Sequence, residues 1–308
     1  MNILIYLKSE ISSFQVNDTQ FANLVARLSQ HNFVRVTSKE EFKQKLPETD
    51  AAVVWSFPAH WYALAPKLKH VFTPAAGHDW IAPDPQGQVS IHFGKFHGKI
   101  MAESLLAMML FMNRQLGVAI KQQRDHVWAA KNFESCRRIV GQTALIIGYG
   151  AIGQHIARLL SAIGMTVYGL RRTKIDNTSY VKRLFTGNEL HEALTFADHV
   201  VCILPGDTTT DNFLDAAAFA KMKPGAIVYN LGRGNTIDHN VLVAALNSGA
   251  IAGAFLDVLP KEPLPPTSSL WDTPKLYFSP HAAAVYAEYL DLYFKELAEL
   301  INKLGTSV

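Results

Sequence analysis

The sequence has very few cysteines. Its 308 residues contain two, Cys136 and Cys202, and Cys202 stands inside an apolar run. Two thiols cannot build the disulfide framework of a small secreted protein, and a cysteine in an apolar run is typical of a reduced, buried thiol. We therefore expect a reducing, cytoplasmic compartment.

Long apolar runs and an excess of one charge are also missing. The longest apolar stretch, residues 105–112, is far shorter than the roughly 18 to 20 residues that a membrane span requires. The first residues lack the basic region and the cleavage site of a signal peptide. Lys and Arg number 29 and Asp and Glu 26, so the formal net charge is only +3. The composition therefore predicts no membrane span and no nucleic-acid partner.

The composition that remains is typical of a folded protein, 49% apolar and 18% charged, and the length favours two domains. Short apolar runs at 2–7, 33–37 and 51–55 alternate with a helical pattern near 19–29. From residue 142 the alternation restarts, with apolar runs at 144–147, 166–170, 200–204, 226–230, 251–256 and 276–278. Such runs are typical of strands buried on both faces, so the second part is predicted to be a doubly wound parallel sheet.

Two predicted helices bear on the domain organisation. The helix that begins near Met101 is apolar on nearly every face, so it must be buried, and burial against a second copy of the chain is favoured. The segment 283–304 predicts an amphipathic helix that packs back on the first domain. The predicted domains are residues 1–98 and 282–308 for a discontinuous domain, and residues 99–281 for a dinucleotide-binding domain between them.

A glycine motif lies between an apolar run and a predicted helix. It consists of Gly148, Tyr149, Gly150, Ala151, Ile152 and Gly153. In this context the first Gly allows a tight turn, the second lets the backbone approach a pyrophosphate, and the third lets helix and strand pack closely. The helix N-terminus then supplies amide hydrogens for the phosphates. The alternative is an ordinary glycine-rich turn.

The next apolar run ends in Arg171-Arg172-Thr173-Lys174, where a carboxylate would accept hydrogen bonds from a free ribose 2′-hydroxyl. Guanidinium groups bind a 2′-phosphate instead, so the cofactor is predicted to be NADP(H). A solvated basic turn is the alternative, and Asp176 nearby keeps NAD(H) open.

Three polar groups follow three of the later runs. They are Arg233 in Asn230-Leu231-Gly232-Arg233, Glu262 after Leu256-Asp257, and His281 in Ser279-Pro280-His281. Parallel sheets place their ligands at the carboxyl ends of strands, so these side chains are expected to share one crevice. Arg233 suits a substrate carboxylate, and His281 suits proton donation. Glu262 would hold the imidazole and favour its protonated form. No metal is required, and none is predicted.

These segments resemble, in order and spacing, those of the D-isomer-specific 2-hydroxyacid dehydrogenases. The resemblance rests on the glycine motif, Leu204-Pro205 with Thr210, residues 230–238, Leu256-Asp257 with Glu262, and Ser279-Pro280-His281. Residues 68–79 resemble the family's substrate-carboxylate loop, and residues 102–104 with the following apolar run resemble the start of its dimerisation helix. The resemblance covers nearly the whole chain.

The resemblance implies a Rossmann cofactor domain and a discontinuous flavodoxin-like α/β substrate domain. It implies reduction of a 2-keto acid to a D-2-hydroxy acid, with hydride arriving at C2 and a proton coming from His281, in a catalytic triad completed by Arg233 and Glu262. The implied substrate residues are Ala75, Ala76, Gly77, Phe57, Arg233 and His281. The implied cofactor residues are the glycine motif, Arg171, Arg172, Thr173, Leu204, Pro205, Thr210, Leu231, Gly232, Arg233, Asp257 and His281.

Within the family, the arginine pair and the segments Leu264-Pro265-Pro266 and Leu270-Trp271 resemble the NADPH-dependent glyoxylate/hydroxypyruvate reductases. The carboxylate loop departs from the family's Gly-Ala-Gly, since it is Ala75-Ala76-Gly77 here, and no Ser or Thr follows His281 within five residues. Trp55, Phe57 and Trp61 either line a pocket for an apolar side chain or pack in the core. Trp128 either reaches a neighbouring subunit or packs locally.

Two other functions share this fold. Formate dehydrogenases carry glutamine where Glu262 stands, which disfavours that activity. A dinucleotide-sensing corepressor keeps the fold and the triad but acts as a binding protein, and it is the alternative to an enzyme. The chain has neither a long tail nor a basic extension of the kind such a protein carries.

Overall fold

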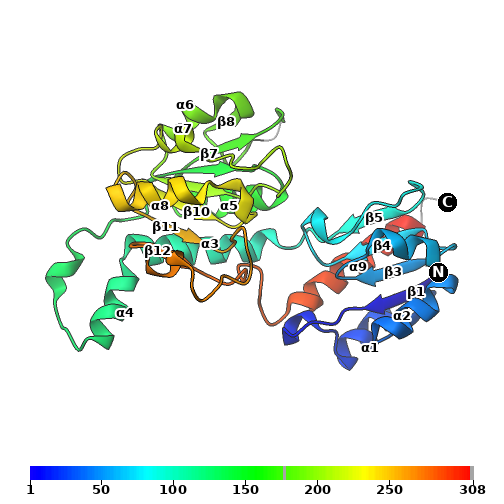
Figure 1. Cartoon of the computed structure of the whole chain (residues 1–308). Coiled ribbons are helices and arrows are strands. Elements are labelled where there is room, and N and C mark those ends of the chain that lie inside the picture. The colour runs from blue at the N-terminus through cyan, green and yellow to red at the C-terminus, as the bar shows by residue number, and fades with distance from the viewer. Residues whose placement is uncertain (176–177, 306–308) are drawn as a thin grey trace. The chain divides into compact units, whose positions relative to one another are not determined.

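The computed structural model describes residues 1–175 and 178–305 and divides the chain into two compact units (Figure 1). Unit 1 comprises Met1–His97 with Val285–Val308, and unit 2 comprises Gly98–Ala284. Asp176, the residue that leaves NAD(H) as an alternative cofactor, lies outside the described residues. Within the described part of the chain, no helix combines the length and the apolar content that crossing a bilayer requires.

Unit 1 is built on a five-stranded parallel sheet of order β2-β1-β3-β4-β5. Its strands are β1 (Asn2–Tyr6), β2 (Asn32–Arg35), β3 (Ala51–Val54), β4 (His70–Thr73) and β5 (Ser90–Phe93). Its α-helices are α1 (Asp18–Arg27), α2 (Lys39–Lys45) and α9 (Tyr289–Gly305). The strand order is that of flavodoxin-like sheets.

The local sequence explains how unit 1 closes. Asn17 begins α1 with a capping box, in which its Oδ1 accepts from Gln20 N–H at 2.8 Å and Gln20 Oε1 accepts from Asn17 N–H at 3.2 Å. Gln20 Nε2 also donates to Asp291 Oδ2 of α9 at 2.8 Å. The last helix therefore completes the unit that the first strand begins.

Unit 2 contains a seven-stranded parallel sheet of order β12-β11-β10-β9-β6-β7-β8. The strands are β6 (Thr143–Ile147), β7 (Thr166–Arg171), β8 (Arg183–Thr186), β9 (His199–Cys202), β10 (Ile227–Asn230), β11 (Gly253–Leu256) and β12 (Leu276–Phe278). The α-helices are α3 (Gly98–Asn113), α4 (Leu116–Arg124), α5 (Ala151–Ala162), α6 (Leu190–Leu194), α7 (Ala216–Phe219) and α8 (His239–Ser248).

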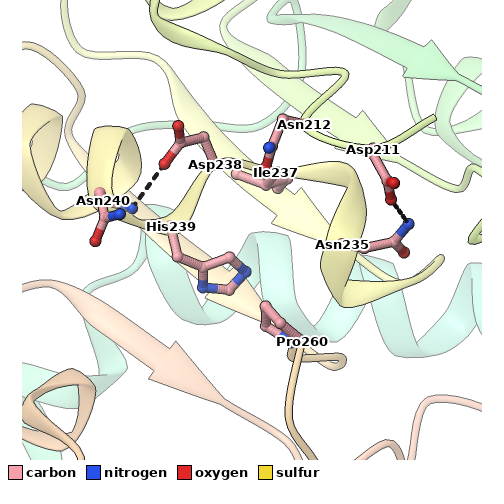
Figure 2. Close-up of a pocket in the computed structure, with 8 residues that line it drawn as sticks. All are labelled: Asp211, Asn212, Asn235, Ile237, Asp238, His239, Asn240 and Pro260. Atoms are coloured by element: carbon pink, nitrogen blue, oxygen red, sulfur yellow. Dashed lines mark hydrogen bonds between the residues drawn. The ribbon is translucent and has the colours of Figure 1, made fainter. Parts of the chain in front are cut away.

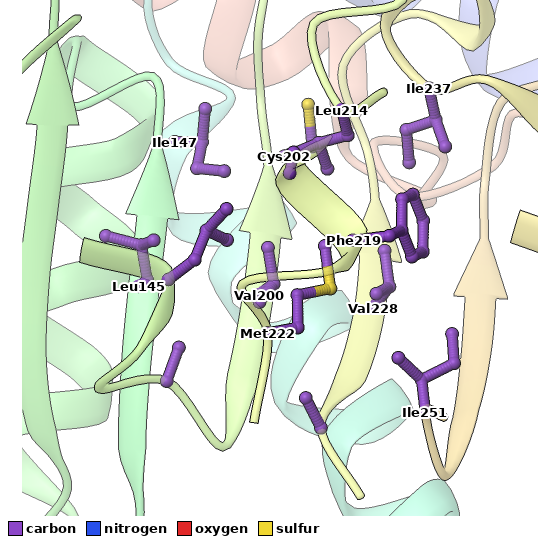
Figure 3. Packing of buried hydrophobic residues seen from close by; sticks show 14 of the residues in the cluster. Leu145, Ile147, Val200, Cys202, Leu214, Phe219, Met222, Val228, Ile237 and Ile251 are labelled. Atoms are coloured by element: carbon purple, nitrogen blue, oxygen red, sulfur yellow. The ribbon is translucent and has the colours of Figure 1, made fainter. Parts of the chain in front are cut away.

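The order of the sheet in unit 2 reverses between β6 and β9, as in a dinucleotide-binding Rossmann sheet. Its central strands are buried on both faces because apolar side chains from the sheet and the helices interdigitate, as Figure 3 shows around Val200, Val228 and Met222. The predicted fold class, a Rossmann domain with a second flavodoxin-like α/β domain, is confirmed. The crevice of such a sheet lies at the carboxyl ends of β6 and β9.

Helix α3 buries most of its apolar side chains against the rest of unit 2, including Met101, Leu105 and Met109, so the burial that the sequence assigns preferentially to a second copy occurs for these residues within the chain. Leu110 remains 39% exposed. Helix α4 differs, because it has no buried residue: Gly117 in its first turn packs on Tyr277 of β12, and Figure 1 shows the helix extending from there away from the sheet.

The closing helix starts later than the sequence predicts. Helix α9 begins at Tyr289 and not at residue 283, because the N–H groups of Ala282 and Ala283 donate to the carboxylate of Asp257. Strands β5 and β8 were not predicted, since both lie at sheet edges and are half exposed, without a continuous apolar run.

We predict that acid destabilises the protein through its buried histidines. His199 is fully buried, with Nε2 2.7 Å from Gln142 Oε1, and burial together with the charge of Arg137 lowers its pKa to about 4. The unfolded chain binds a proton near pH 6.5, so the free energy of unfolding should fall as the pH drops from about 7 to about 4. A shift of this size corresponds to about 3 kcal/mol.

Urea unfolding at pH 7.5, 6 and 5 measures this dependence. His199→Gln should flatten the fall in the free energy of unfolding, whereas His60→Gln at an exposed position should leave it unchanged. The prediction is wrong if wild type and His199→Gln lose the same free energy between pH 7.5 and pH 5.

Candidate active site

The turn after β6 forms a cradle with one open side. Gly148 has a φ of +104°, and a Cβ there would lie 2.5 Å from Ile203 O, so only glycine fits this turn. A Cβ on Gly153 would lie 2.5 Å from Gly148 O, which shows how closely α5 packs on the strand. A Cβ on Gly150 would meet no atom within 4 Å. The open space therefore lies beside the second glycine, where a pyrophosphate would need it.

The backbone N–H groups of this glycine turn are of two kinds, those that donate within the turn and those that do not. The N–H groups of Gly148 and Tyr149 donate to Leu170 O at 2.9 and 3.0 Å, and Gly150 N–H donates to Gly148 O at 2.8 Å. The ring of Tyr149 is buried beneath Gly169. The amides of Ala151 and Ile152, in the first turn of α5, have no partner inside the helix and are the donors available to a phosphate.

The arginine pair stands at the end of β7, at the same edge of the sheet. Arg171 closes the strand and is half exposed, while Arg172 and Thr173 are exposed. The charge of Arg172 contributes to lowering the pKa of Asp207 after hydrogen bonds from Thr209, so Arg172 lies near the loop that follows β9. In that loop, Thr210 donates to Pro205 O at 2.6 Å and holds the backbone of the turn.

Arg233 is positioned from the buried end of β10. Asn230, fully buried, donates from Nδ2 to Arg233 O at 3.0 Å and accepts from Gly232 N–H at 3.0 Å. Arg233 Nη1 donates to Gly232 O at 2.9 Å. The aliphatic part of the Arg233 side chain packs on Gly206, since a Cβ added to Gly206 would lie 2.8 Å from Arg233 Cγ. Leu231 is buried beneath this turn.

His281 is fixed through its backbone by Asp257. The carboxylate of Asp257 is 3% exposed and its Oδ1 accepts from Ser279 Oγ at 2.6 Å, Ala282 N–H at 2.8 Å and Ala283 N–H at 3.1 Å. His281 N–H donates to Asp257 O at 2.8 Å. The histidine has a φ of +53°, which non-glycine residues seldom adopt. The surrounding hydrogen bonds therefore hold it in an unfavourable conformation.

Glu262 bonds to the imidazole of His281. Glu262 Oε2 lies 2.8 Å from His281 Nδ1, and Glu262 Oε1 accepts from Leu259 N–H at 2.8 Å. Both side chains are partly exposed, at 36% for Glu262 and 43% for His281. Because Nδ1 is engaged, Nε2 is the ring nitrogen left to exchange a proton with a substrate.

The predicted substrate loop belongs to unit 1. Ala75 N–H donates to Thr73 Oγ1 at 3.2 Å, and Ala75 O accepts from Gly94 N–H at 3.1 Å. Within the described part of the chain, neither Ala76 nor Gly77 uses its N–H in a hydrogen bond, so both can donate to an anion.

The structure does not place Phe57 at a surface that a substrate can reach. Its ring is fully buried with Phe42 and Trp61 in the core of unit 1, and its backbone pairs with residues 80 and 82. Phe57 and Trp61 therefore have the packing role that the sequence left as the alternative to a pocket.

A polar cavity of about 360 Å³ lies beside the turn that follows Arg233 (Figure 2). It contains none of the predicted site residues. Its lining residues are Asp211, Asn212, Asn235, Ile237, Asp238, His239, Asn240 and Pro260. Gly234, in the same turn, packs directly on Leu259 and Pro260.

Sequence reasoning missed the residues that hold the site in place. Asn230, Ser279 and Gly206 each orient a predicted site residue, but none carries chemistry of its own. Their only sequence signal is position, because a polar or small residue at the end of an apolar run often organises the turn that follows.

Comparison with known proteins identifies the family of the chain. The family model of the NAD-binding domain of D-isomer-specific 2-hydroxyacid dehydrogenases matches residues 106–283. The D-3-phosphoglycerate dehydrogenase of Mycobacterium tuberculosis is 31% identical over 273 residues, which make up 86% of this chain and 51% of that protein. The chain thus spans about half the length of this relative. The glyoxylate/hydroxypyruvate reductase A of Yersinia enterocolitica is 29% identical, with 77% of each chain covered.

A solved structure of a related protein has a similar fold. The NADPH-dependent glyoxylate/hydroxypyruvate reductase of Sinorhizobium meliloti, in complex with NADP and sulfate, superposes with a TM-score of 0.82 at 26% identity. The match covers 100% of this chain and 96% of that one. Together with the family model, which covers more than half of the sequence, these matches confirm the resemblance. The chain belongs to the family of D-isomer-specific 2-hydroxyacid dehydrogenases.

Proposed function

We propose that the chain is a reductase that converts a 2-keto acid into a D-2-hydroxy acid with NADPH. The observation that carries this proposal is the His281–Glu262 pair, which stands at the carboxyl edge of a sheet whose first turn has the open glycine cradle. Glyoxylate and hydroxypyruvate are the proposed substrates, because relatives named for them match most of the chain.

The residues present fit a dinucleotide. The open face of Gly150 and the amides of Ala151 and Ile152 suit the pyrophosphate, and Arg171 and Arg172 suit a 2′-phosphate. When bound, the nicotinamide supplies the hydride that reduces the ketone carbon. Asp257 is proposed to contact its carboxamide while keeping the His281 turn in place.

The chain's own residues supply the rest of the chemistry. His281 gives a proton from Nε2 to the ketone oxygen, and Glu262 stabilises the positive charge of the ring before that transfer. Arg233 binds the substrate carboxylate and polarises the ketone. The amides of Ala76 and Gly77 hold the same carboxylate through two N–H groups. The cytoplasmic location expected from the sequence stays a prediction.

We also propose that the protein is a homodimer, with α3 and the segment after it at the interface. Helix α4 has nine residues and none is buried, and so short a helix is only marginally stable unless something packs on it. Several large apolar side chains of α4 and of the residues that follow are exposed, with Ile120 at 57% and Trp128 at 101%. An apolar hollow of about 310 Å³ also lies along α3. A second copy related by a twofold axis would cover both surfaces.

Removing the imidazole should stop turnover and spare cofactor binding. For His281→Ala we expect kcat to fall by about 100-fold or more, because general acid catalysis contributes this much. Initial rates of NADPH oxidation with glyoxylate, hydroxypyruvate, pyruvate and phenylpyruvate measure the effect, and fluorescence titration measures NADPH binding. Normal turnover in His281→Ala would sink the proposed role. Bound dinucleotide with no turnover in the wild type would favour a sensing protein.

Removing the arginine pair should change cofactor preference. Arg171→Ala with Arg172→Ala should raise the KM for NADPH by about 30-fold or more, because charge-assisted hydrogen bonds to the phosphate are lost. The KM for NADH should change by less than about threefold. Lys174→Ala, at the next exposed basic residue, is the matched control. Equal losses for both cofactors would show that the pair supports the fold instead.

A charge on α4 should separate the dimer. Ile120→Glu is expected to convert the protein to a monomer in light scattering after size exclusion, because a carboxylate would be buried in an apolar interface. Ile11→Glu, at an exposed apolar residue of unit 1, should leave the mass unchanged. A wild type that is monomeric at every concentration tested would refute the proposed interface.

A further inference from the structure

Tyr289 connects three segments of unit 1 behind the substrate loop. It is the first residue of α9 and is 3% exposed. Its hydroxyl oxygen lies 2.8 Å from His97 Nε2 and 3.4 Å from Pro74 O. Pro74 directly precedes the loop Ala75-Ala76-Gly77, whose amides the proposed function assigns to the substrate carboxylate. The phenol therefore touches that loop from its buried side.

Both groups in this contact are uncharged near neutral pH. Burial raises the pKa of Tyr289 well above its ordinary value and lowers the pKa of His97 to about 4, so both groups are neutral at pH 7. The Tyr289 hydroxyl carries one hydrogen, which either His97 Nε2 at 2.8 Å or Pro74 O at 3.4 Å can accept, and the tautomer of His97 decides between them. His97 Nδ1 makes no well-formed hydrogen bond among the described residues, but the nearby backbone carbonyl of Gly94 raises the pKa of His97 against the larger effect of burial.

The ring and the loop are both confined. The Tyr289 ring centroid lies 4.4 Å from that of Phe14 and 4.8 Å from that of Phe96. A Cβ on Gly94 would lie 2.2 Å from Pro74 O. The Pro74 carbonyl therefore contacts both the backbone of Gly94 and the phenol of Tyr289, and its position sets that of the amides that follow.

We propose that Tyr289 is a positioning residue for the substrate-carboxylate loop, acting through Pro74 and oriented by His97. This inference rests on the proposed function for its effect on the substrate. Its effect on the loop depends only on hydrogen bonds within this chain. The two parts can be tested separately, because the loop amides report their own environment whether or not the enzyme turns over.

Tyr289→Phe keeps the ring and removes only the hydroxyl. The KM for the keto acid should rise about three- to tenfold, as expected for the loss of one hydrogen bond, while kcat and NADPH binding change little. Tyr293→Phe is the matched control, because Tyr293 is equally buried on α9 and its hydroxyl has no partner among the described residues. Its KM should stay at the wild-type value.

The loop is followed by NMR on protein labelled with ¹⁵N-alanine, ¹⁵N-glycine and ¹⁵N-histidine. Tyr289→Phe should shift the amide signals of Ala76 and Gly77 and the Nε2 signal of His97, and Tyr293→Phe should leave them in place. Unmoved loop amides would overturn the inference, active enzyme or not. Shifted amides with an unchanged KM in an active enzyme would overturn it too. A wild type inactive on every keto acid would refute the proposed function, with the amide shifts still deciding whether Tyr289 holds the loop.

Discussion

The candidate site depends on the buried carboxylate of Asp257. A charge that is 3% exposed must be surrounded by donors, and here they all come from the segment that carries His281. Satisfying the carboxylate forces the turn at residues 279–283 into one shape. That shape puts His281 at a φ of +53° and its Nδ1 against Glu262. The geometry of the proposed acid is thus a consequence of burying one aspartate.

The same arrangement, in which a buried polar residue orients a partly exposed one, occurs at the end of β10. Asn230 is fully buried and bonds to the backbone on both sides of Arg233, just as Asp257 bonds on both sides of His281. In each case the residue that carries the chemistry is partly exposed, while the residue that orients it is buried at the carboxyl end of a strand. These buried polar groups are hydrogen-bonded mostly to backbone, so they specify one turn conformation.

The fold and the chemical side chains were predictable because both leave local signals. The central strands are continuous apolar runs, and the glycine motif and His281 follow such runs directly. The edge strands β5 and β8 escaped because half-exposed strands lack that signal. The late start of α9 and the burial of Phe57 could not be predicted, since they depend on Asp257 and Phe42, residues distant in the sequence. Packing partners are properties of the folded chain.

The left-handed backbone conformation of His281 also limits which substitutions this site can accept. Holding a non-glycine residue in that region costs about 1 kcal/mol or more, which the hydrogen bonds around Asp257 must offset. Replacing His281 by glycine would relieve the strain but remove the imidazole, and replacing Asp257 by asparagine would set an amide N–H₂ near the backbone donors of Ala282 and Ala283. The histidine and the aspartate are therefore coupled through the backbone, although their side chains share no hydrogen bond among those the structure describes. The stability of this turn and the proposed proton donation by His281 therefore depend on the same few hydrogen bonds at the end of β11.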